Sequence, residues 1–309
     1  MNVVNVVPMS HTMPETQVGV PHVSVMAREV VNLMQPAGAT LLDLTVGAGG
    51  HSAALLEAGA ASVIGLDRDP RALELARARL ERFGERALVR HASFSTFEEV
   101  LDLLGLETVD GLLADLGVSS MQLDEPHRGM SFRAEGPLDM RMDTTRGETA
   151  LELLARVDDE GLTEILAKLG EERRARRVAR CIKQELEAGK LETTLDLRRA
   201  VVRAVGPARI GGVDPATKTF QAIRMAVNRE LFELEGLLEA AARRVRPGGR
   251  LAILTFHSLE DRMVKRALQT DAWEPLTSKP LVAEEDELSH NPRARSAKLR
   301  VARRREVSR

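Results

Sequence analysis

The sequence predicts an α/β fold with a mainly parallel sheet and an inserted α-helical subdomain. Short apolar runs alternate with helical patterns over residues 40–116. A helix-rich stretch of 104 residues, 117–220, then interrupts this alternation, and a further apolar run at 250–256 resumes it. Because 104 residues far exceed an ordinary connection, we expect the stretch to fold as a subdomain.

Each element before the insert has its own local signal. Four strands are expected at 40–44, 61–66, 88–91 and 109–116, where apolar runs are short and bounded by turn residues. A helix is expected through 53–56 and another over 97–104. Between them, Asp69 supplies an N-cap and Pro70 a first helical residue, followed by an apolar face at Leu73, Ala76 and Leu80.

After the insert, apolar residues recur at alternating spacings of four and three from Ile223 to Val245, which predicts one amphipathic helix. Pro247-Gly248-Gly249 ends it, and a strand follows. We therefore expect a flexible N-terminal tail over 1–20, a sheet domain made of 21–123 and 219–309, and an inserted helical substrate-recognition domain at 124–218.

Composition narrows the class of protein. Hydrophobic residues make up 43% of the 309 residues and charged residues 29%, and no apolar run is long enough to span a membrane. The first 20 residues lack the Lys and Arg of a secretory signal, and Cys181 is the single cysteine. We expect a cytoplasmic protein with no membrane contact. The seven histidines are not at ligand spacing, so no metal is expected.

Positive charge is concentrated in two places, although the net charge is only −2. One cluster lies on a predicted helix and includes Arg173, Arg174 and Arg177; the other is the segment from Arg293 to the end, with a single acid, Glu306. Each cluster could contact nucleic-acid phosphates, or it could simply be a solvated part of the surface.

The turn after the first strand is the strongest candidate for a cofactor site. Gly47, Gly49 and Gly50 allow close approach of a ligand, and Asp67 ends the next strand, where a carboxylate can accept both hydroxyls of a ribose. An adenosine-containing cofactor fits these features. The dinucleotide fingerprint requires glycine where this chain has Ser52, which disfavours nicotinamide or flavin. The pattern Asp43-x-Thr45-x-Gly47-x-Gly49 instead resembles the first motif of Rossmann-like class I methyltransferases.

Longer motifs narrow the resemblance. From His22 to Ala302 the chain looks like the MraW/RsmH type, the bacterial 16S rRNA cytosine-N4 methyltransferases. The words that carry the resemblance are His22-Val-Ser-Val-Met26, Gly47-Ala-Gly-Gly-His-Ser52, Asp67-Arg-Asp-Pro70, Asp115-Leu-Gly-Val-Ser-Ser-Met-Gln-Leu-Asp124, Arg128-Gly-Met-Ser-Phe132, Pro137-Leu-Asp-Met-Arg-Met-Asp143, Thr219-Phe-Gln-Ala-Ile-Arg224, Phe256-His-Ser-Leu-Glu-Asp261 and Asn291-Pro-Arg-Ala-Arg-Ser296.

The resemblance implies S-adenosylmethionine as cofactor and, as substrate, a cytidine in the decoding region of 16S rRNA within the 30S subunit. The oligomeric state stays open, a homodimer included. The cofactor contacts that the family implies fall on Gly49, Gly50, His51, Asp67, Phe94, Asp115 and Gln122. From the residues alone, His51 could equally be the cap of the following helix. Phe94 could equally be a residue of the hydrophobic core.

Methylation of an exocyclic amine needs acceptors that draw on its N–H bonds, because its lone pair is delocalised into the ring. Asp115, at the end of the fourth strand, is the expected catalytic residue. The Pro-Pro-aromatic that often follows it in amino-methyltransferases is missing, so Phe132 is considered as the stacking surface, with a place in the insert's core as the alternative. The expected RNA contacts are Arg141, Arg146, Arg173, Arg174, Arg177 and His257.

Two other functions compete with that of an rRNA methyltransferase. A non-catalytic, RNA-binding ribosome-assembly factor is disfavoured because Gly49, Asp67 and Asp115 occur together. A nicotinamide oxidoreductase is disfavoured by Ser52 and by the helical insert.

Overall fold

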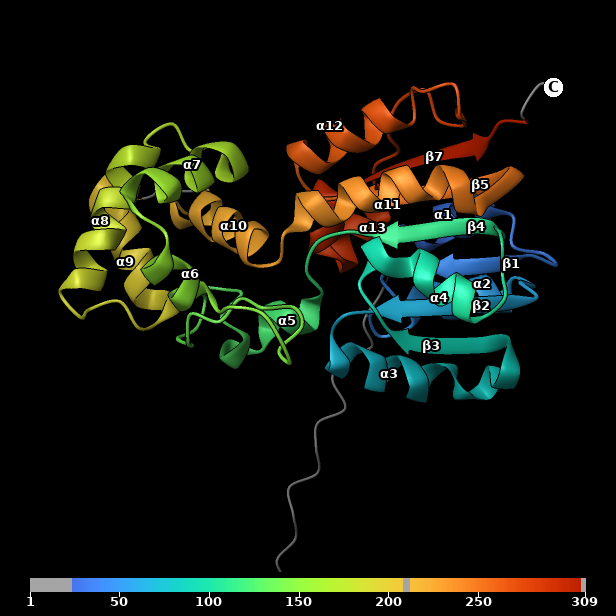
Figure 1. Cartoon of the computed structure of the whole chain (residues 1–309), viewed down its shortest axis with the longest axis horizontal. Coiled ribbons are helices and arrows are strands. Elements are labelled where there is room, and N and C mark those ends of the chain that lie inside the picture. Colours follow the sequence, from blue (N-terminus) through green and yellow to red (C-terminus); the bar gives the residue numbers. More distant parts are fainter. Residues whose placement is uncertain (1–23, 208–211, 307–309) are drawn as a thin grey trace, which may run out of the picture.

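A seven-stranded, mostly parallel sheet is the centre of the larger unit. The computed structural model describes residues 24–207 and 212–306, so the predicted tail at 1–20 lies outside it; the strand order is β3-β2-β1-β4-β5-β7-β6 (Figure 1). β1 to β5 run parallel, whereas β7 pairs antiparallel with β5 and β6. The strands are β1 (Thr40–Asp43), β2 (Ser62–Asp67), β3 (Ala87–His91), β4 (Val109–Asp115), β5 (Val245–Thr255), β6 (Trp273–Pro275) and β7 (Lys298–Arg304).

Helices cover both faces of this sheet because successive side chains of each strand point into two different cores. Leu41 and Val63 lie in one core and Leu42 and Ile64 in the other. The first core is covered by α1 (Ala27–Met34), α2 (Gly50–Glu57), α3 (Pro70–Leu80) and, near the C-terminus, η4 (Pro292–Ser296), which follows α13 (Glu285–His290). The second is covered by α4 (Phe97–Leu103), α11 (Glu230–Arg244) and α12 (Ser258–Ala267).

The loops after the strands carry short helices. As predicted, Asp69 caps α3, its Oδ1 accepting from the amide of Arg71 at 3.0 Å. The shorter elements are η1 (Glu81–Arg86), η2 (Phe94–Thr96), α5 (Ser120–Asp124) and η3 (Pro126–Arg128). Within the described residues, no helix has the length and apolar character that a bilayer crossing requires.

A helical unit lies beyond the carboxyl ends of the parallel strands (Figure 1). Its own apolar core includes Leu154, Leu162, Val178 and Leu197, and Cys181 packs against it. Its helices are α6 (Ala150–Arg156), α7 (Asp159–Gly170), α8 (Ala175–Glu187), α9 (Thr194–Val205) and α10 (Ala216–Val227).

The single helix predicted over 223–245 is wrong, because the chain breaks between α10 and α11. Arg229 adopts a left-handed conformation with φ 51°. The Asn228 side chain binds the irregular loop instead, donating to the Met140 carbonyl and accepting from the Met142 amide, each at 2.7 Å. α10 packs against α7 and places Ile223 in the helical core. We therefore propose that the insert ends at Asn228 and not at residue 218.

The basic segment near the C-terminus has a structural role. β7 lies between β5 and β6. Arg300 pairs with Asp261 at 2.7 Å, and Arg303 pairs with Glu274 at 2.6 Å. Arg304 donates to the carbonyl of Ala242. These three arginines are bound by groups of the protein itself, and contact of this segment with RNA phosphates stays a prediction.

Candidate active site

The turn between β1 and α2 places backbone without side chains at the carboxyl edge of the sheet, here called its rim. Gly47 and Gly49 have φ of 52° and 81°, values that side chains rarely adopt. Gly50 opens α2, and a Cβ there would lie 2.0 Å from the Ser24 hydroxyl oxygen. The turn therefore requires glycine for its geometry and leaves amides near the strand ends.

Asp67 links this turn to the end of β2. Its Oδ2 accepts from the Gly47 amide and its Oδ1 from the Asp69 amide, each at 2.9 Å. Burial raises the pKa of Asp67 to about 6, against the opposing effect of these two amide donors. A carboxylate so fixed points its remaining lone pairs into the space above the turn.

His51 lies between two carboxylates at the ends of β1 and β4. Its Nε2 is 3.6 Å from Asp115 Oδ2, and neither ring nitrogen nor Asp115 Oδ1 has a hydrogen-bond partner, although all three are buried. Burial lowers the pKa of His51, but the charges of Asp115 and Asp43 outweigh it, so the pKa stands above its usual value. The helix cap is Gly49, not His51. Unsatisfied groups of this kind indicate a polar ligand.

A cavity of about 940 Å³ opens at this rim, where the strand order reverses. Of the seven predicted cofactor contacts, six line it; Gly49 does not, and a Cβ added at Gly49 would lie 3.3 Å from the Leu80 side chain. Phe94 presents its ring there, with the Arg68 guanidinium 5.3 Å from the ring centroid. The lining members of the predicted set are Gly50, His51, Asp67, Phe94, Asp115 and Gln122.

Gln122 is held rigidly in the wall of this cavity. Its Nε2 donates to Asp69 Oδ2 at 2.8 Å, and its Oε1 accepts from the Ser119 amide at 3.0 Å. The same Asp69 carboxylate forms a buried ion pair with Arg128, at 2.8 Å. Gln122 therefore positions the loop after β4 through one donor and one acceptor of its amide group.

Sequence reasoning missed several groups at this site. Asp43 ends β1 and accepts from the Ser52 hydroxyl at 2.7 Å, in the same strand-end position that singled out Asp67. Arg293 reaches the cavity wall and bonds to the Val118 carbonyl and the Ser120 hydroxyl. Arg293 belongs to the Asn291 to Ser296 motif and to the basic C-terminal segment, but neither signal predicted a place in the cavity wall.

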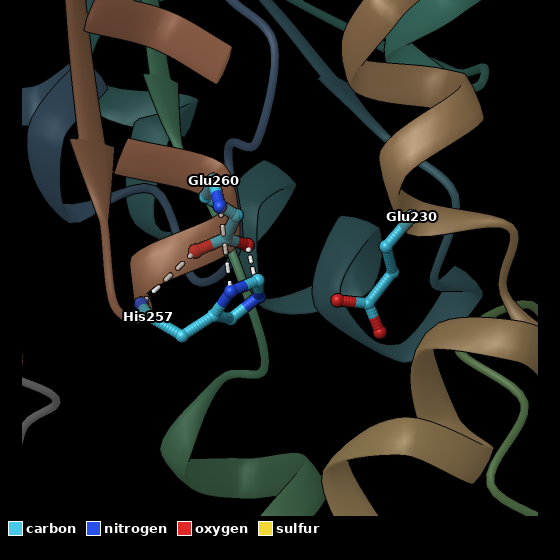
Figure 2. A group of neighbouring side chains, drawn as sticks. All are labelled: Glu230, His257 and Glu260. Carbon is cyan, nitrogen blue, oxygen red and sulfur yellow. Dashed lines mark hydrogen bonds and ion pairs between the residues drawn. The ribbon is translucent and has the colours of Figure 1, made fainter. Parts of the chain in front are cut away.

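A second cluster lies where β5 ends, beside the same cavity. Glu230, His257 and Glu260 point toward one another from α11 and the start of α12 (Figure 2). His257 Nε2 is 3.1 Å from Glu260 Oε1, and Glu230 is paired through both oxygens with Arg224, at 2.7 and 2.9 Å. Glu230 and Glu260 line the cavity. Of this cluster, the sequence analysis named only His257.

The predicted RNA-contact arginines differ in their surroundings. Arg141 is bound bidentately by Asp139, at 2.8 Å for both contacts, and Arg146 pairs with Asp143 at 2.7 Å. Arg174 donates to the Val205 carbonyl at 2.9 Å. Arg173, which precedes α8, and Arg177 within α8 are exposed, as are Arg176 and Arg180 of the same helix.

Phe132 packs against the core of the helical unit. Its ring lies edge-on to that of Phe220, with centroids 4.9 Å apart, and is partly buried. This contact favours a place in the insert's core over a role as the stacking surface for the base. The aromatic side chains that line the cavity are Phe94 and Phe256.

Comparison with known proteins decides the family. The sequence profile described as the MraW methylase family matches residues 19–305. The chain belongs to the MraW methylase family. It is a methyltransferase with a Rossmann-like class I fold, so the resemblance and the fold class stated from the sequence are confirmed.

Two relatives of this family member are both described as ribosomal RNA small subunit methyltransferase H. The protein from Sorangium cellulosum is 64% identical, over 98% of each chain. The protein from Synechococcus sp. (strain JA-2-3B'a(2-13)) is 50% identical, over 98% of this chain and 99% of that one. Among solved structures, an rRNA methylase from Streptococcus thermophilus matches with a TM-score of 0.42 and 11% identity, covering 91% of this chain and 94% of its own.

Proposed function

We propose that this MraW methylase family member uses S-adenosylmethionine to methylate the exocyclic N4 amine of a cytidine in the decoding region of 16S rRNA. The acceptor would be the 30S subunit, in the cytoplasm. The observation that carries the proposal is the cavity at the rim of the sheet, where Asp67, His51 and Asp115 face a common space. The small-subunit rRNA in the descriptions of both relatives supports the substrate class.

The residues of the cavity fit this cofactor. Asp67 offers lone pairs to ribose hydroxyls, and Phe94 offers an apolar ring for adenine. The unpartnered atoms of His51 and Asp115 suit the charged amino-acid end. When bound, S-adenosylmethionine supplies an electrophilic methyl group on its sulfonium sulfur.

Asp115 suits the role of acceptor for the target amine. It ends β4, and its amide is fixed by the Thr45 hydroxyl at 2.6 Å. Its Oδ1 is buried without a partner, so it can accept an N–H bond of the amine as positive charge develops on that nitrogen. Its other oxygen, Oδ2, lies 3.6 Å from His51 Nε2, so Oδ1 remains available to the amine.

The decisive experiment is mass spectrometry of small-subunit rRNA from cells with and without this protein. We expect one N4-methylated cytidine to disappear in the deletion strain and to return when the purified protein and S-adenosylmethionine are added to 30S subunits. If the methylation pattern is unchanged while the protein still binds the subunit, the non-catalytic assembly factor is the better account.

Cofactor affinity should depend on the ionisation of Asp67. The pKa of Asp67 is raised to about 6, and only the carboxylate can accept from both ribose hydroxyls. Affinity should therefore rise with pH and level off above 6, with binding about tenfold weaker at pH 5 than at pH 7. Calorimetric titration with S-adenosylmethionine measures this. Asp67→Asn should bind more weakly and lose the pH dependence; if the slope persists in this variant, His51 is its source.

The exposed arginines at the start of α8 and just before it should bind RNA phosphates. The double variant Arg173→Glu/Arg177→Glu should bind 30S subunits at least tenfold more weakly, and the slope of log affinity against log salt should fall by about 1 to 2. Cofactor affinity should be unchanged. Arg77→Glu on α3, also exposed, serves as the matched control. If the slope of log affinity against log salt is unchanged in the double variant, these arginines do not contact RNA phosphates.

A further inference from the structure

His257 has a buried ring nitrogen, Nε2, that makes no hydrogen bond within the part of the chain that the structure describes. Its Nδ1 accepts from the Glu260 amide at 3.4 Å and so caps α12. A ring nitrogen that accepts carries no proton, so the hydrogen of this ring is on Nε2. Nε2 is buried and makes no hydrogen bond among the described residues, although Glu260 Oε1 lies 3.1 Å away (Figure 2).

Glu260 places an acceptor beside that donor. Its Oε2 accepts from the Phe256 amide at 2.9 Å, which fixes the carboxylate. Its Oε1 lies 3.1 Å from His257 Nε2, and Glu260 lines the cavity into which Asp115 also projects. β5 is the neighbour of β4 in the sheet, so the carboxyl ends of these strands bring Glu260 and Asp115 to the same cavity.

The pair does not have the character of a metal site, although the ligand atoms of Glu230, His257 and Glu260 lie within 4.8 Å of one another. A metal-bound histidine donates through its second nitrogen, whereas Nδ1 of His257 accepts. Both oxygens of Glu230 are held by Arg224. The cluster therefore offers one N–H donor and one carboxylate acceptor side by side.

We propose that His257 and Glu260 read the amino edge of the target cytosine, His257 Nε2 donating to N3 and Glu260 Oε1 accepting from N4. The inference rests on the proposed function and specifies how the base is recognised. Cytosine presents an amine donor next to a ring acceptor, and a carboxylate accepting from that amine is an established mode of base recognition. Uracil presents the reverse order, an oxygen acceptor next to an N–H donor, so it would oppose both groups.

The test replaces one ring atom of the substrate and one side chain of the protein. 30S subunits are reconstituted with 16S rRNA carrying either cytidine or 3-deazacytidine at the methylated position, which removes the N3 acceptor. Single-turnover methyl transfer is measured for the wild type and for His257→Asn. Asparagine is a good N-cap, so α12 keeps its cap while the Nε2 donor is lost.

The wild type should be about tenfold slower on 3-deazacytidine than on cytidine. His257→Asn should be about tenfold slower on cytidine and lose little more on 3-deazacytidine, because the two changes remove the same hydrogen bond. His127→Ala, at an exposed histidine outside the cavity, should keep the full tenfold discrimination. If His257→Asn also keeps it, the proposal is overturned. If the wild type forms no N4-methylcytidine on the cytidine subunits, it is the proposed function that fails.

A second variant tests the acceptor. In Glu260→Gln the single side-chain oxygen is needed by the Phe256 amide, so the NH₂ group would face the N4 amine. Transfer to cytidine should fall more than tenfold with cofactor affinity retained. A wild-type transfer rate in Glu260→Gln would overturn the assignment of Glu260.

Discussion

Asp115→Ala is expected to lower the rate of methyl transfer about a hundredfold to a thousandfold at saturating cofactor. The alanine removes the buried, unpartnered Oδ1 that would accept from the amine, and a positioned acceptor or base of this kind contributes about 10²–10⁴-fold. Asp115→Asn should lose less if the carboxylate acts only as a hydrogen-bond acceptor, because an amide oxygen still accepts. It should lose as much as alanine if the carboxylate takes the proton.

Single-turnover assays on 30S subunits measure this rate, and calorimetry measures cofactor affinity separately. Affinity will also drop in both variants, because Asp115 faces His51 at 3.6 Å. The assays are therefore run with the cofactor saturating. Asp110→Asn, at the other end of the same strand, should transfer at the wild-type rate. A wild-type rate in Asp115→Ala would remove Asp115 from the chemistry.

Local patterns predicted the sheet and its rim well. β1 to β4 follow from short apolar runs, and Asp67 and Asp115 end theirs, so their common position at one edge follows from parallel pairing alone. β5 differs, because it begins at Val245 and includes the Pro247-Gly248-Gly249 segment that was expected to precede the strand. The glycine turn is likewise a local signal, since positive φ at Gly47 and Gly49 needs only the residues themselves. These features lie on a few consecutive residues, which is why the sequence was sufficient.

Contacts between distant segments were not predictable in this way. The apolar spacing runs unbroken from 223 to 245, yet the chain bends at Asn228, because its amide side chain binds the backbone of Met140 and Met142. The sequence gives no partners for the C-terminal arginines. The ion pair between Arg300 and Asp261 arises only because β7 pairs with β5. His257 and Glu260 both belong to the Phe256 to Asp261 motif of the sequence. Only the three-dimensional structure shows that Nε2 of His257 is buried without a hydrogen bond.

The ion pair between Arg128 and Asp69 joins the irregular loop of the insert to the cofactor side of the sheet. Arg128 is 5% exposed and Asp69 is fully buried. The guanidinium also donates to the Met142 carbonyl at 2.8 Å, and Asp69 additionally accepts from Gln122. One carboxylate thus connects α3, α5 and the loop, and its charge is balanced by a single arginine.

Arg128→Leu should therefore destabilise the protein by about 3–5 kcal/mol, because it leaves the Asp69 carboxylate buried without a counter-charge. For a chain of this size the melting midpoint should fall by roughly 10 °C, measured by calorimetry. Adding Asp69→Asn should recover part of the loss, since the neutral amide still caps α3 and removes the uncompensated charge. Arg156→Leu breaks an equally close but exposed pair with Glu148 and should leave the midpoint nearly unchanged. Equal midpoints for Arg128→Leu and Arg156→Leu would mean that the buried pair does not stabilise the junction.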